Sequence, residues 1–355
     1  MNTRFLKACN NEKVDTIPVW FMRQAGRYLP QYRKIREKHS IVEIIKNPEI
    51  CSYISILPVK ELNVDACILF SDLTTPLIFM DVEFDIVENE GPILLKTIEN
   101  YKDILNLKDF DERKIYFVGE TISILKQISN VPIIGFIGGQ FTFVSYLVEG
   151  RSTRNFIKTK FLMQNETKIW NYLMEKITEN LFMFAKYQIE NGVDALQIFD
   201  SWIYVLGSYE FEMYVLPYLE NLISKLKLFK VPIIYFSLGD LAIKFIDRIN
   251  ADVFSIDWRV DISQLFKINK KFAIQGNLDP CVLLTSFENI KLRVEMLLSQ
   301  INNNKGYIFS CGHGILPQTP VENVKMLVEF VPVSYTHLRA HETPEHLVCR
   351  LLLEK

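Results

Sequence analysis

The chain has 355 residues, of which 49% are hydrophobic and 23% are charged, and its formal net charge is -2 at pH 7. These values exclude an intrinsically disordered chain, a small disulfide-stabilised protein and a strongly basic nucleic-acid-binding protein. A chain of this length can bury roughly three quarters of the surface that its unfolded form exposes, so a large core needs neither metals nor disulfides.

The cysteines and the N-terminal segment favour a cytoplasmic location. The six cysteines lie at positions 9, 51, 67, 281, 311 and 349, and they form no Cys-x-x-Cys pair and no regular framework. This pattern is typical of reduced thiols. Residues 1–13 contain no apolar signal-peptide core, and no run approaches the roughly 18 apolar residues of a membrane span. We therefore expect a soluble cytoplasmic protein that binds neither membranes nor nucleic acid.

Short apolar runs alternate with longer amphipathic segments along the chain. Eight runs are expected to be strands: 15–22, 64–71, 132–138, 195–201, 232–238, 253–258, 273–278 and 307–313. They are nearly all apolar, which is typical of strands buried on both faces of a parallel sheet. Eight strands alternating with helices predict a single α/β domain, a (β/α)8 barrel of the TIM type. A doubly wound sheet is the alternative, but no Gly-x-Gly-x-x-Gly fingerprint follows an early strand.

Two segments between the runs have recognisable ends. Residues 79–96 alternate in polarity around a Glu-Gly-Pro turn, which predicts a small hairpin inserted after the second strand. Residues 171–192 are amphipathic and end in Asn191-Gly192, which predicts that a helix stops there.

Polar residues follow most of the predicted strands, and in a barrel the active site forms at the carboxyl ends of the strands. The residues at these positions are Arg23, Arg27, Ser71, Asp72, Asp200, Ser201, Asp240, Asp257, Asn277, Cys311 and His313. Any one of them could simply meet solvent at the end of a strand, and Cys311 is better explained as a small core residue. Taken together with the first loop, the set indicates a polar active site.

The loop after the first predicted strand is rich in arginine. Residues 23–36 contain four arginines and one lysine. The planar, permanently charged guanidinium group suits carboxylate or phosphate, and Gly26 would let the backbone approach a ligand closely. A solvated turn explains Lys34 and can also accommodate Arg33, but it explains Arg23 and Arg27 poorly. The loop therefore predicts an anionic ligand.

The same loop resembles a family signature. Residues 23–37, RQAGRYLPQYRKIRE, are similar to the signature of the uroporphyrinogen decarboxylases. The resemblance continues in family order through FSD at 70–72, GxxGxxxTxxxYLVEG at 135–150, LQIFDSW at 196–202, QGNLDP at 275–280, and GHG followed by PxE at 312–322. It extends from residue 1 to about residue 332.

The resemblance implies a cofactor-free carboxy-lyase with a (β/α)8 fold, usually homodimeric and without a metal site. Such an enzyme removes the four acetate carboxyls of uroporphyrinogen III to give coproporphyrinogen III and CO2. The resemblance also assigns the substrate-binding residues. It places four residues on the loop that binds substrate carboxylates: Arg23, Gln24, Arg27 and Arg36. Asp72 corresponds to the aspartate that binds the pyrrole N–H groups, and Tyr146 to the active-site tyrosine. Cleft-lining residues are matched by Ser201 and His313, and apolar walls by Phe70 and Phe199.

The chemistry of a pyrrole acetate is consistent with this set. The ring must accept a proton before CO2 leaves, so the site must stabilise a cation while it holds carboxylates. We expect Asp72 to supply the negative charge and the arginines to hold the carboxylates. The proton donor stays open between Arg23, Tyr146 and His313, because an arginine with a pKa above about 12 is a weak acid.

Residues 137–142 depart from the family pattern. The family often has Ser-Gly-x-Pro-Trp-Thr where this chain reads Ile-Gly-Gly-Gln-Phe-Thr. The change supplies or removes no obligatory charge, but it is expected to alter the packing around Tyr146.

The resemblance ends near residue 332. We expect residues 1–332 to form the barrel and residues 333–355, which look like translated adapter sequence, to be a non-native tail; an extra terminal helix is the alternative. His341 and His346 do not fit a zinc motif, because they are five residues apart with Pro344 between them.

Two other functions compete with the decarboxylase. Zinc methyltransferases of the same superfamily move methyl groups from corrinoid carriers to thiols and carry a His-x-Cys pair after the fifth strand, whereas this chain reads Phe236-Ser-Leu-Gly-Asp240 there. The other competitor is a non-catalytic tetrapyrrole carrier. A carrier needs to grip carboxylates but has no use for a cation-stabilising Asp72.

Overall fold

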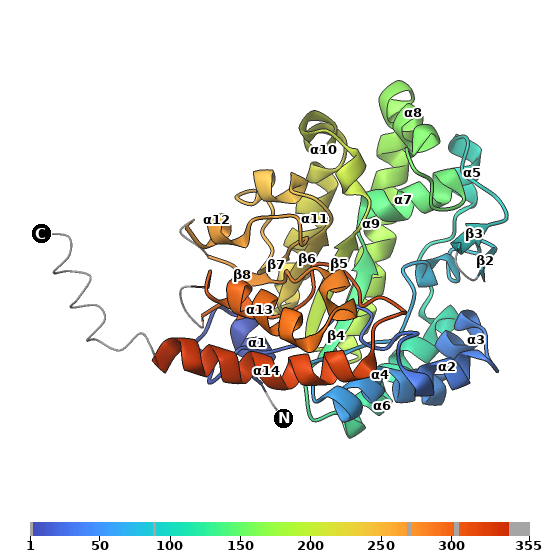
Figure 1. The fold of residues 1–355 in the computed structure, drawn as a ribbon. Coiled ribbons are helices and arrows are strands. Elements are labelled where there is room, and N and C mark those ends of the chain that lie inside the picture. The colour runs from blue at the N-terminus through green and yellow to red at the C-terminus, as the bar shows by residue number, and fades with distance from the viewer. Residues whose placement is uncertain (1–2, 88–89, 268–270, 302–304, 341–355) are drawn as a thin grey trace, which may run out of the picture.

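Seven parallel strands form one sheet in the computed structural model, which describes residues 3–87, 90–267, 271–301 and 305–340 (Figure 1). In sheet order the strands are β1 (Cys67–Ile68), β4 (Ile133–Gly138), β5 (Ala195–Asp200), β6 (Ile233–Ser237), β7 (Val253–Ser255), β8 (Ala273–Gln275) and β9 (Tyr307–Ile308). The order of the strands in this sheet is their order along the chain. The two strands that lie between β1 and β4 in the chain form a separate sheet. The predicted alternation of parallel strands and helices is confirmed.

Each of the seven strands lies inside one of the predicted apolar runs. Every residue of β4 and of β5 is buried, as expected for strands covered on both faces. Alternate residues of β5 join different clusters of buried side chains: Ala195 and Phe199 belong to one, and Leu196 and Ile198 to the other. The sheet therefore has a core on each face.

The first predicted run, 15–22, is not a strand in the structure. Val19 makes a single parallel bridge to Phe309. Pro18 has no N–H to donate, and the N–H of Val19 donates to the Asp65 carboxylate (2.8 Å) instead of to a neighbouring carbonyl. The ladder is therefore incomplete, although the Phe309 N–H donates to the Pro18 carbonyl (2.9 Å) and the Asp65 N–H donates to the Val19 carbonyl (2.8 Å).

An antiparallel pair of strands lies between β1 and β4 in the chain. It consists of β2 (Phe84–Val87) and β3 (Gly91–Leu94). The Leu94 N–H donates to the carbonyl of Gly150 at the end of α7 (2.8 Å), and the Ile98 N–H donates to the carbonyl of Leu147 (2.8 Å). These bonds tie the pair to α7 (Gln140–Glu149).

Helices surround the sheet (Figure 1). The others are α1 (Arg4–Cys9), α2 (Pro30–Arg36), α3 (Ile41–Lys46), α4 (Pro48–Leu62), α5 (Tyr101–Asn106), α6 (Tyr116–Ile128), α8 (Ile157–Asn165), α9 (Thr167–Glu190), α10 (Ser208–Tyr214), α11 (Leu216–Leu226), α12 (Ile262–Lys267), α13 (Phe287–Leu298) and α14 (Val321–Ala340). As predicted, α9 ends at Asn191-Gly192, where Gly192 has a φ of 110°.

The expected domain boundary at residue 332 falls inside α14. This helix packs against α13 and α4 and continues through Pro332 to Ala340. Val331 is fully buried and Ser334 is 6% exposed. The histidine pair at 341 and 346 lies outside the described residues.

Candidate active site

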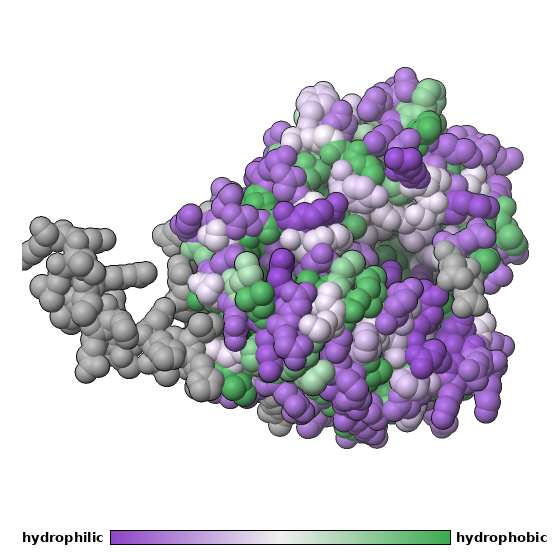
Figure 2. All heavy atoms as spheres, viewed as in Figure 1, coloured by the Kyte–Doolittle hydropathy of each residue, from purple (hydrophilic) through white to green (hydrophobic). Residues whose placement is uncertain are grey.

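A cavity of about 870 Å³ opens at the carboxyl ends of the strands. Figure 2 shows a hollow in the surface beside β2 and β3, with hydrophobic residues deep inside it and hydrophilic residues around it. Nine of the ten residues that the sequence suggested for the site line this cavity: Arg23, Arg27, Arg36, Phe70, Asp72, Tyr146, Phe199, Ser201 and His313. The structure thus brings together side chains that are almost 300 positions apart in the chain.

Gln24 is the residue that does not line the cavity. It is fully buried, and its side chain is used within the protein. Its amide oxygen accepts the Phe21 N–H (3.1 Å) and its amide nitrogen donates to the Ala66 carbonyl (2.9 Å). Gln24 therefore fastens the arginine loop to the segment before β1, and a role in substrate contact does not follow from its position.

The arginine loop is held by its own side chains. One nitrogen of Arg33 donates to the carbonyls of Arg27 (2.8 Å) and Tyr28 (2.9 Å), and the Tyr28 hydroxyl donates to the Gln24 carbonyl (2.7 Å). The sequence pattern left Arg33 as a possible solvated residue, but its side chain bonds to the loop and also lines the cavity. A guanidinium group with five donors can do both.

Arg36 and Arg23 enter the cavity from either end of this loop. Arg36 donates to the carbonyl of His39, just before α3. Arg23 has a φ of 58° and passes close to Gly314, where a Cβ atom would lie 2.5 Å from the Cδ atom of Arg23. The Arg23 side chain therefore passes directly over the backbone of the residue that follows His313.

Asp72 stands just after β1. Its Oδ1 atom accepts the N–H (2.9 Å) and the hydroxyl (2.5 Å) of Thr74. These bonds form an Asx turn, which fixes the carboxylate relative to the backbone. Asp72 and Arg23 both act on Tyr146: burial raises the pKa of the Tyr146 hydroxyl, the Asp72 charge raises it further, and the Arg23 charge lowers it. Opposite charges therefore meet close to one tyrosine.

Tyr146 belongs to an aromatic stack. The ring of Trp202 lies 4.2 Å from that of Tyr146 and 4.7 Å from that of Phe156, measured between ring centroids. Trp202 also lines the cavity. Its position in the LQIFDSW motif was the only signal that could have identified it.

His313 lies between two aromatic rings. Phe236 and Trp258 contact it edge-on, with centroid distances of 6.1 and 6.2 Å. Burial lowers the pKa of His313 to about 4, and the charge of Arg23 adds to the effect. His313 is therefore neutral at neutral pH.

Apolar residues complete the wall, and several of them have no motif that could reveal them. Phe136, Phe70 and Phe199 come from the strand ends, while Ile86, Val87 and Pro92 come from the β2–β3 pair. The cavity therefore has apolar surfaces beside its charged groups.

Of the other polar residues at strand ends, Ser71 lines the cavity, whereas Asp200, Asp240, Asp257, Asn277 and Cys311 do not. Asp257 is fully buried and holds the Arg259 guanidinium, Asn277 donates to the carbonyls of Asp257 and Val260, and Asp240 is exposed beside Lys244. Asp200 is fully buried, and Cys311 is buried as expected of a core residue.

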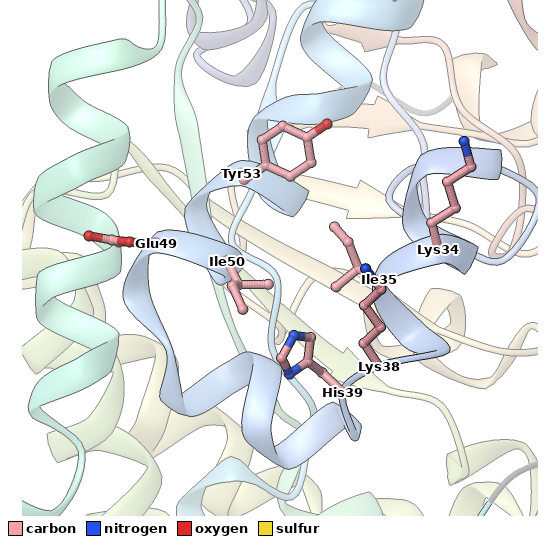
Figure 3. Close-up of a pocket in the computed structure, with 7 residues that line it drawn as sticks. All are labelled: Lys34, Ile35, Lys38, His39, Glu49, Ile50 and Tyr53. Carbon is pink, nitrogen blue, oxygen red and sulfur yellow. The ribbon is translucent and has the colours of Figure 1, made fainter.

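A second, smaller hollow of about 340 Å³ lies between the end of α2 and the start of α4 (Figure 3). It is lined by Lys34, Ile35, Lys38, His39, Glu49, Ile50 and Tyr53. Lys34 is exposed and does not line the larger cavity.

Neither a metal-binding cluster nor a membrane-spanning helix is found among the described residues. Within residues 3–87, 90–267, 271–301 and 305–340, no group of three or more His, Cys, Asp and Glu side chains could hold a metal ion. Over the same ranges, no helix has the length and apolar character needed to cross a membrane.

The fold and the cavity define a class: α/β proteins with a TIM-barrel-like parallel sheet and a charged cavity at its carboxyl edge. A methyltransferase from Methanosarcina mazei has this fold, with a TM-score of 0.77 and 20% identity over 95% of this chain and 98% of that one. The family model for uroporphyrinogen decarboxylase (URO-D) matches residues 1–332. The chain belongs to this family.

Curated relatives agree with the family match. The chain is 41% identical over 337 residues to the uroporphyrinogen decarboxylase of Solibacter usitatus, covering 93% of this chain and 97% of the relative. It is 42% identical over 333 residues to that of Thermus thermophilus, covering 93% and 98%. The motifs identified in the sequence therefore belong to a similarity that spans nearly the whole chain.

Proposed function

We propose that this protein is a carboxy-lyase that removes the four acetate carboxyls of uroporphyrinogen III, giving coproporphyrinogen III and CO2 for haem biosynthesis. One observation carries the proposal beyond family membership. Arginines and an ordered aspartate share a single cavity with apolar walls. Carboxylates need the positive charges, and a protonated pyrrole needs the negative one.

The roles of the residues follow from their charges and positions. Arg23, Arg27 and Arg36 bind substrate carboxylates at the loop side of the cavity. Asp72 uses Oδ1 to accept the bonds from Thr74, so Oδ2 is the oxygen that we assign to the pyrrole N–H groups and to the ring cation. Phe70, Phe199 and Ser201 form the wall against which the macrocycle rests.

The proton donor is assigned among three residues. A pKa of about 4 leaves His313 without the extra proton at neutral pH in the free protein, so it is better suited to accept or share a hydrogen bond. Tyr146 carries its proton, although its raised pKa makes it a weak acid. We propose Arg23 and Tyr146 as the donor groups, because both carry a proton at neutral pH and both line the cavity.

The finer architecture is also part of the proposal. The hydrogen bonds of residues 18–20 to Phe309 on one side and of Val19 to Asp65 on the other support a closed (β/α)8 barrel, with β2 and β3 as its hairpin insertion. We place the protein in the cytoplasm and regard residues 333–355 as an addition to the barrel domain of residues 1–332.

A homodimer is the proposed assembly. Exposed apolar side chains on α8 and on α10 support it: Ile157, Phe161, Tyr209 and Met213 are each at least 55% exposed. Such side chains are better buried in an interface than left in water. Sedimentation equilibrium tests the assembly, and a single species of 41.5 kDa would contradict it.

An anaerobic assay of the purified protein with uroporphyrinogen III tests the function. Oxidation of the products to porphyrins should give species with between eight and four carboxyl groups, without added metal or cofactor. Unchanged substrate together with tight binding would indicate a tetrapyrrole carrier. Zinc-dependent methylation of a thiol, without loss of CO2, would indicate the methyltransferase.

A further inference from the structure

A buried carboxylate lies behind the cavity wall, at the carboxyl end of β5. Asp200 is fully buried and does not line the cavity. Its Oδ1 atom accepts the hydroxyl (2.7 Å) and the N–H (3.3 Å) of Thr142, and its Oδ2 atom accepts the hydroxyl of Tyr235 (3.1 Å). Three donors therefore converge on one carboxylate, from α7 and from β6.

The surroundings of Asp200 are closely fitted to a buried carboxylate. Burial raises the pKa of Asp200 to about 6, while the three hydrogen bonds favour the charged form. Gly139, which precedes α7, has no room for a side chain, because a Cβ atom there would lie 2.3 Å from the Cγ atom of Asp200. An apolar residue at the end of β5 would pack without the desolvation cost that a buried carboxylate carries.

Thr142 connects Asp200 to a residue that lines the cavity. Its hydroxyl oxygen, which donates to Asp200, also accepts the N–H of Trp202 (3.1 Å). The Trp202 ring stacks on Tyr146 with an interplanar angle of 42°, and both residues line the cavity. Tyr146 stands one helical turn after Thr142 on α7, so both ends of the stack depend on the same threonine.

We propose that Asp200 and Thr142 are positioning residues that hold Tyr146 and Trp202 in the geometry needed for the reaction. Asp200 anchors the start of α7 to the end of β5, and Thr142 links this anchor to the backbone of Trp202. The inference rests on the proposed function, since it concerns that reaction. Misplacement of a reacting or binding group by about 1 Å costs on the order of 100-fold in rate.

The test uses the full-length protein and three variants. Asp200→Asn keeps the size of the side chain but places an amide nitrogen, which cannot accept a hydrogen bond, among the Thr142 and Tyr235 donors. Thr142→Val keeps the shape but removes the hydroxyl, and Thr142→Ser restores the hydroxyl. The matched control is Asp240→Asn at the end of β6, where the carboxylate is 69% exposed and outside the cavity.

We expect kcat to fall between about 10-fold and 100-fold in Asp200→Asn and Thr142→Val, with the Michaelis constant changing less than about threefold. Thr142→Ser should recover most of the loss, and Asp240→Asn should match the wild type. A purely structural role would instead lower the melting temperature and the amount of active protein, with kcat per active site unchanged.

A spectroscopic readout separates this inference from the proposed function. The near-ultraviolet circular dichroism of Trp202 is obtained by subtracting the spectrum of Trp202→Phe, and the same subtraction is made in the Asp200→Asn background. The Trp202 band should weaken when Asp200 is replaced. If the wild type proves inactive but the Trp202 band weakens in Asp200→Asn, the proposed function alone is refuted. If the variant shows an unchanged band and an unchanged kcat, the positioning role is overturned.

Discussion

Arg23 and Asp72 bring opposite charges into one cavity. Asp72 is fixed by its Asx turn with Thr74, and the Arg23 side chain passes over Gly314, where a Cβ atom would lie 2.5 Å from its Cδ atom. Preorganised charges of this kind stabilise a transition state without reorganising at the moment of reaction. Single substitutions at these positions should therefore separate binding from turnover.

Arg27 is the residue at which binding is tested. Arg27→Ala should raise the Michaelis constant for uroporphyrinogen III, because a charge-assisted hydrogen bond is worth roughly 1.5 to 3 kcal/mol, or about 10-fold to 150-fold in affinity. Steady-state kinetics measures the effect. Arg113→Ala is the control, since the Arg113 side chain is 86% exposed and lies outside the cavity. An unchanged Michaelis constant in Arg27→Ala would show that this arginine does not hold the substrate.

Asp72 is the residue at which turnover is tested. Asp72→Asn removes the charge and keeps the size, so kcat should fall more than substrate affinity. Two unit charges about 4 Å apart at an effective dielectric constant near 20 attract by about 4 kcal/mol, and after relaxation we expect a loss of roughly 2 to 4 kcal/mol. That corresponds to a decrease in kcat on the order of 30-fold to 1000-fold. A change confined to the Michaelis constant would contradict cation stabilisation by Asp72.

At the scale of elements, the short helix α3 secures the end of the arginine loop. Ser40 and Glu43 form a capping box, in which Ser40 accepts the Glu43 N–H (3.1 Å) and Glu43 accepts the Ser40 N–H (2.7 Å). The preceding residue, His39, supplies the carbonyl that Arg36 contacts. The cap therefore orders the segment that carries a cavity arginine.

Loss of this cap should be measurable. Ser40→Ala should lower the free energy of unfolding by about 1 kcal/mol, because it leaves a backbone N–H of the first turn without its partner. Denaturant unfolding of the variant measures it, with Ser224→Ala in the last turn of α11, away from any helix N-terminus, as the control. Equal stability of Ser40→Ala and the wild type would show that the loop does not depend on the cap.

At the scale of the whole molecule, two buried groups give opposite dependences of stability on pH. The folded pKa of Asp200 is raised from 3.8 to about 6. Protonation of Asp200 therefore contributes stability that is fully present below pH 3.8 and is lost as the pH rises through 6. The folded pKa of His313 is lowered from 6.5 to about 4. The unfolded chain binds a proton at His313 first, so stability falls as the pH drops from 6.5 towards 4.

Each effect is about 3 kcal/mol, from roughly two pKa units at 1.36 kcal/mol each, and they oppose one another between about pH 4 and pH 6. In His313→Gln the free energy of unfolding should therefore fall less steeply on acidification through this window than in the wild type. In Asp200→Asn it should fall more steeply than in the wild type. Denaturant unfolding across the window tests both signs, and parallel curves for all three proteins would refute them.

Much of the fold and the site was predictable because the relevant signals are local. Strands buried on both faces of a sheet are apolar throughout, so β4 and β5 could be recognised from composition. The helix stop at Asn191-Gly192 also depends only on neighbouring residues. The site residues lie in contiguous motifs, and nine of the ten line one cavity.

Three outcomes depended on contacts between distant residues. The segment around Val19 reads as a strand, but the Asp65 carboxylate takes its N–H and leaves a single bridge. Gln24 reads as part of a ligand-binding loop, but the Ala66 carbonyl draws its amide inward. Asp200 reads as one more polar strand end, but it anchors α7 through Thr142.

The parallel α/β architecture, the family and the set of charged groups can thus be read from the chain alone, because periodicity and motifs reside in neighbouring residues. Which groups face the cavity and which form internal hydrogen bonds depends on the folded structure. A polar side chain has several possible partners, and the choice between them depends on backbone groups far away in the chain. Burial then sets the pKa values of His313 and Asp200, which no local pattern contains.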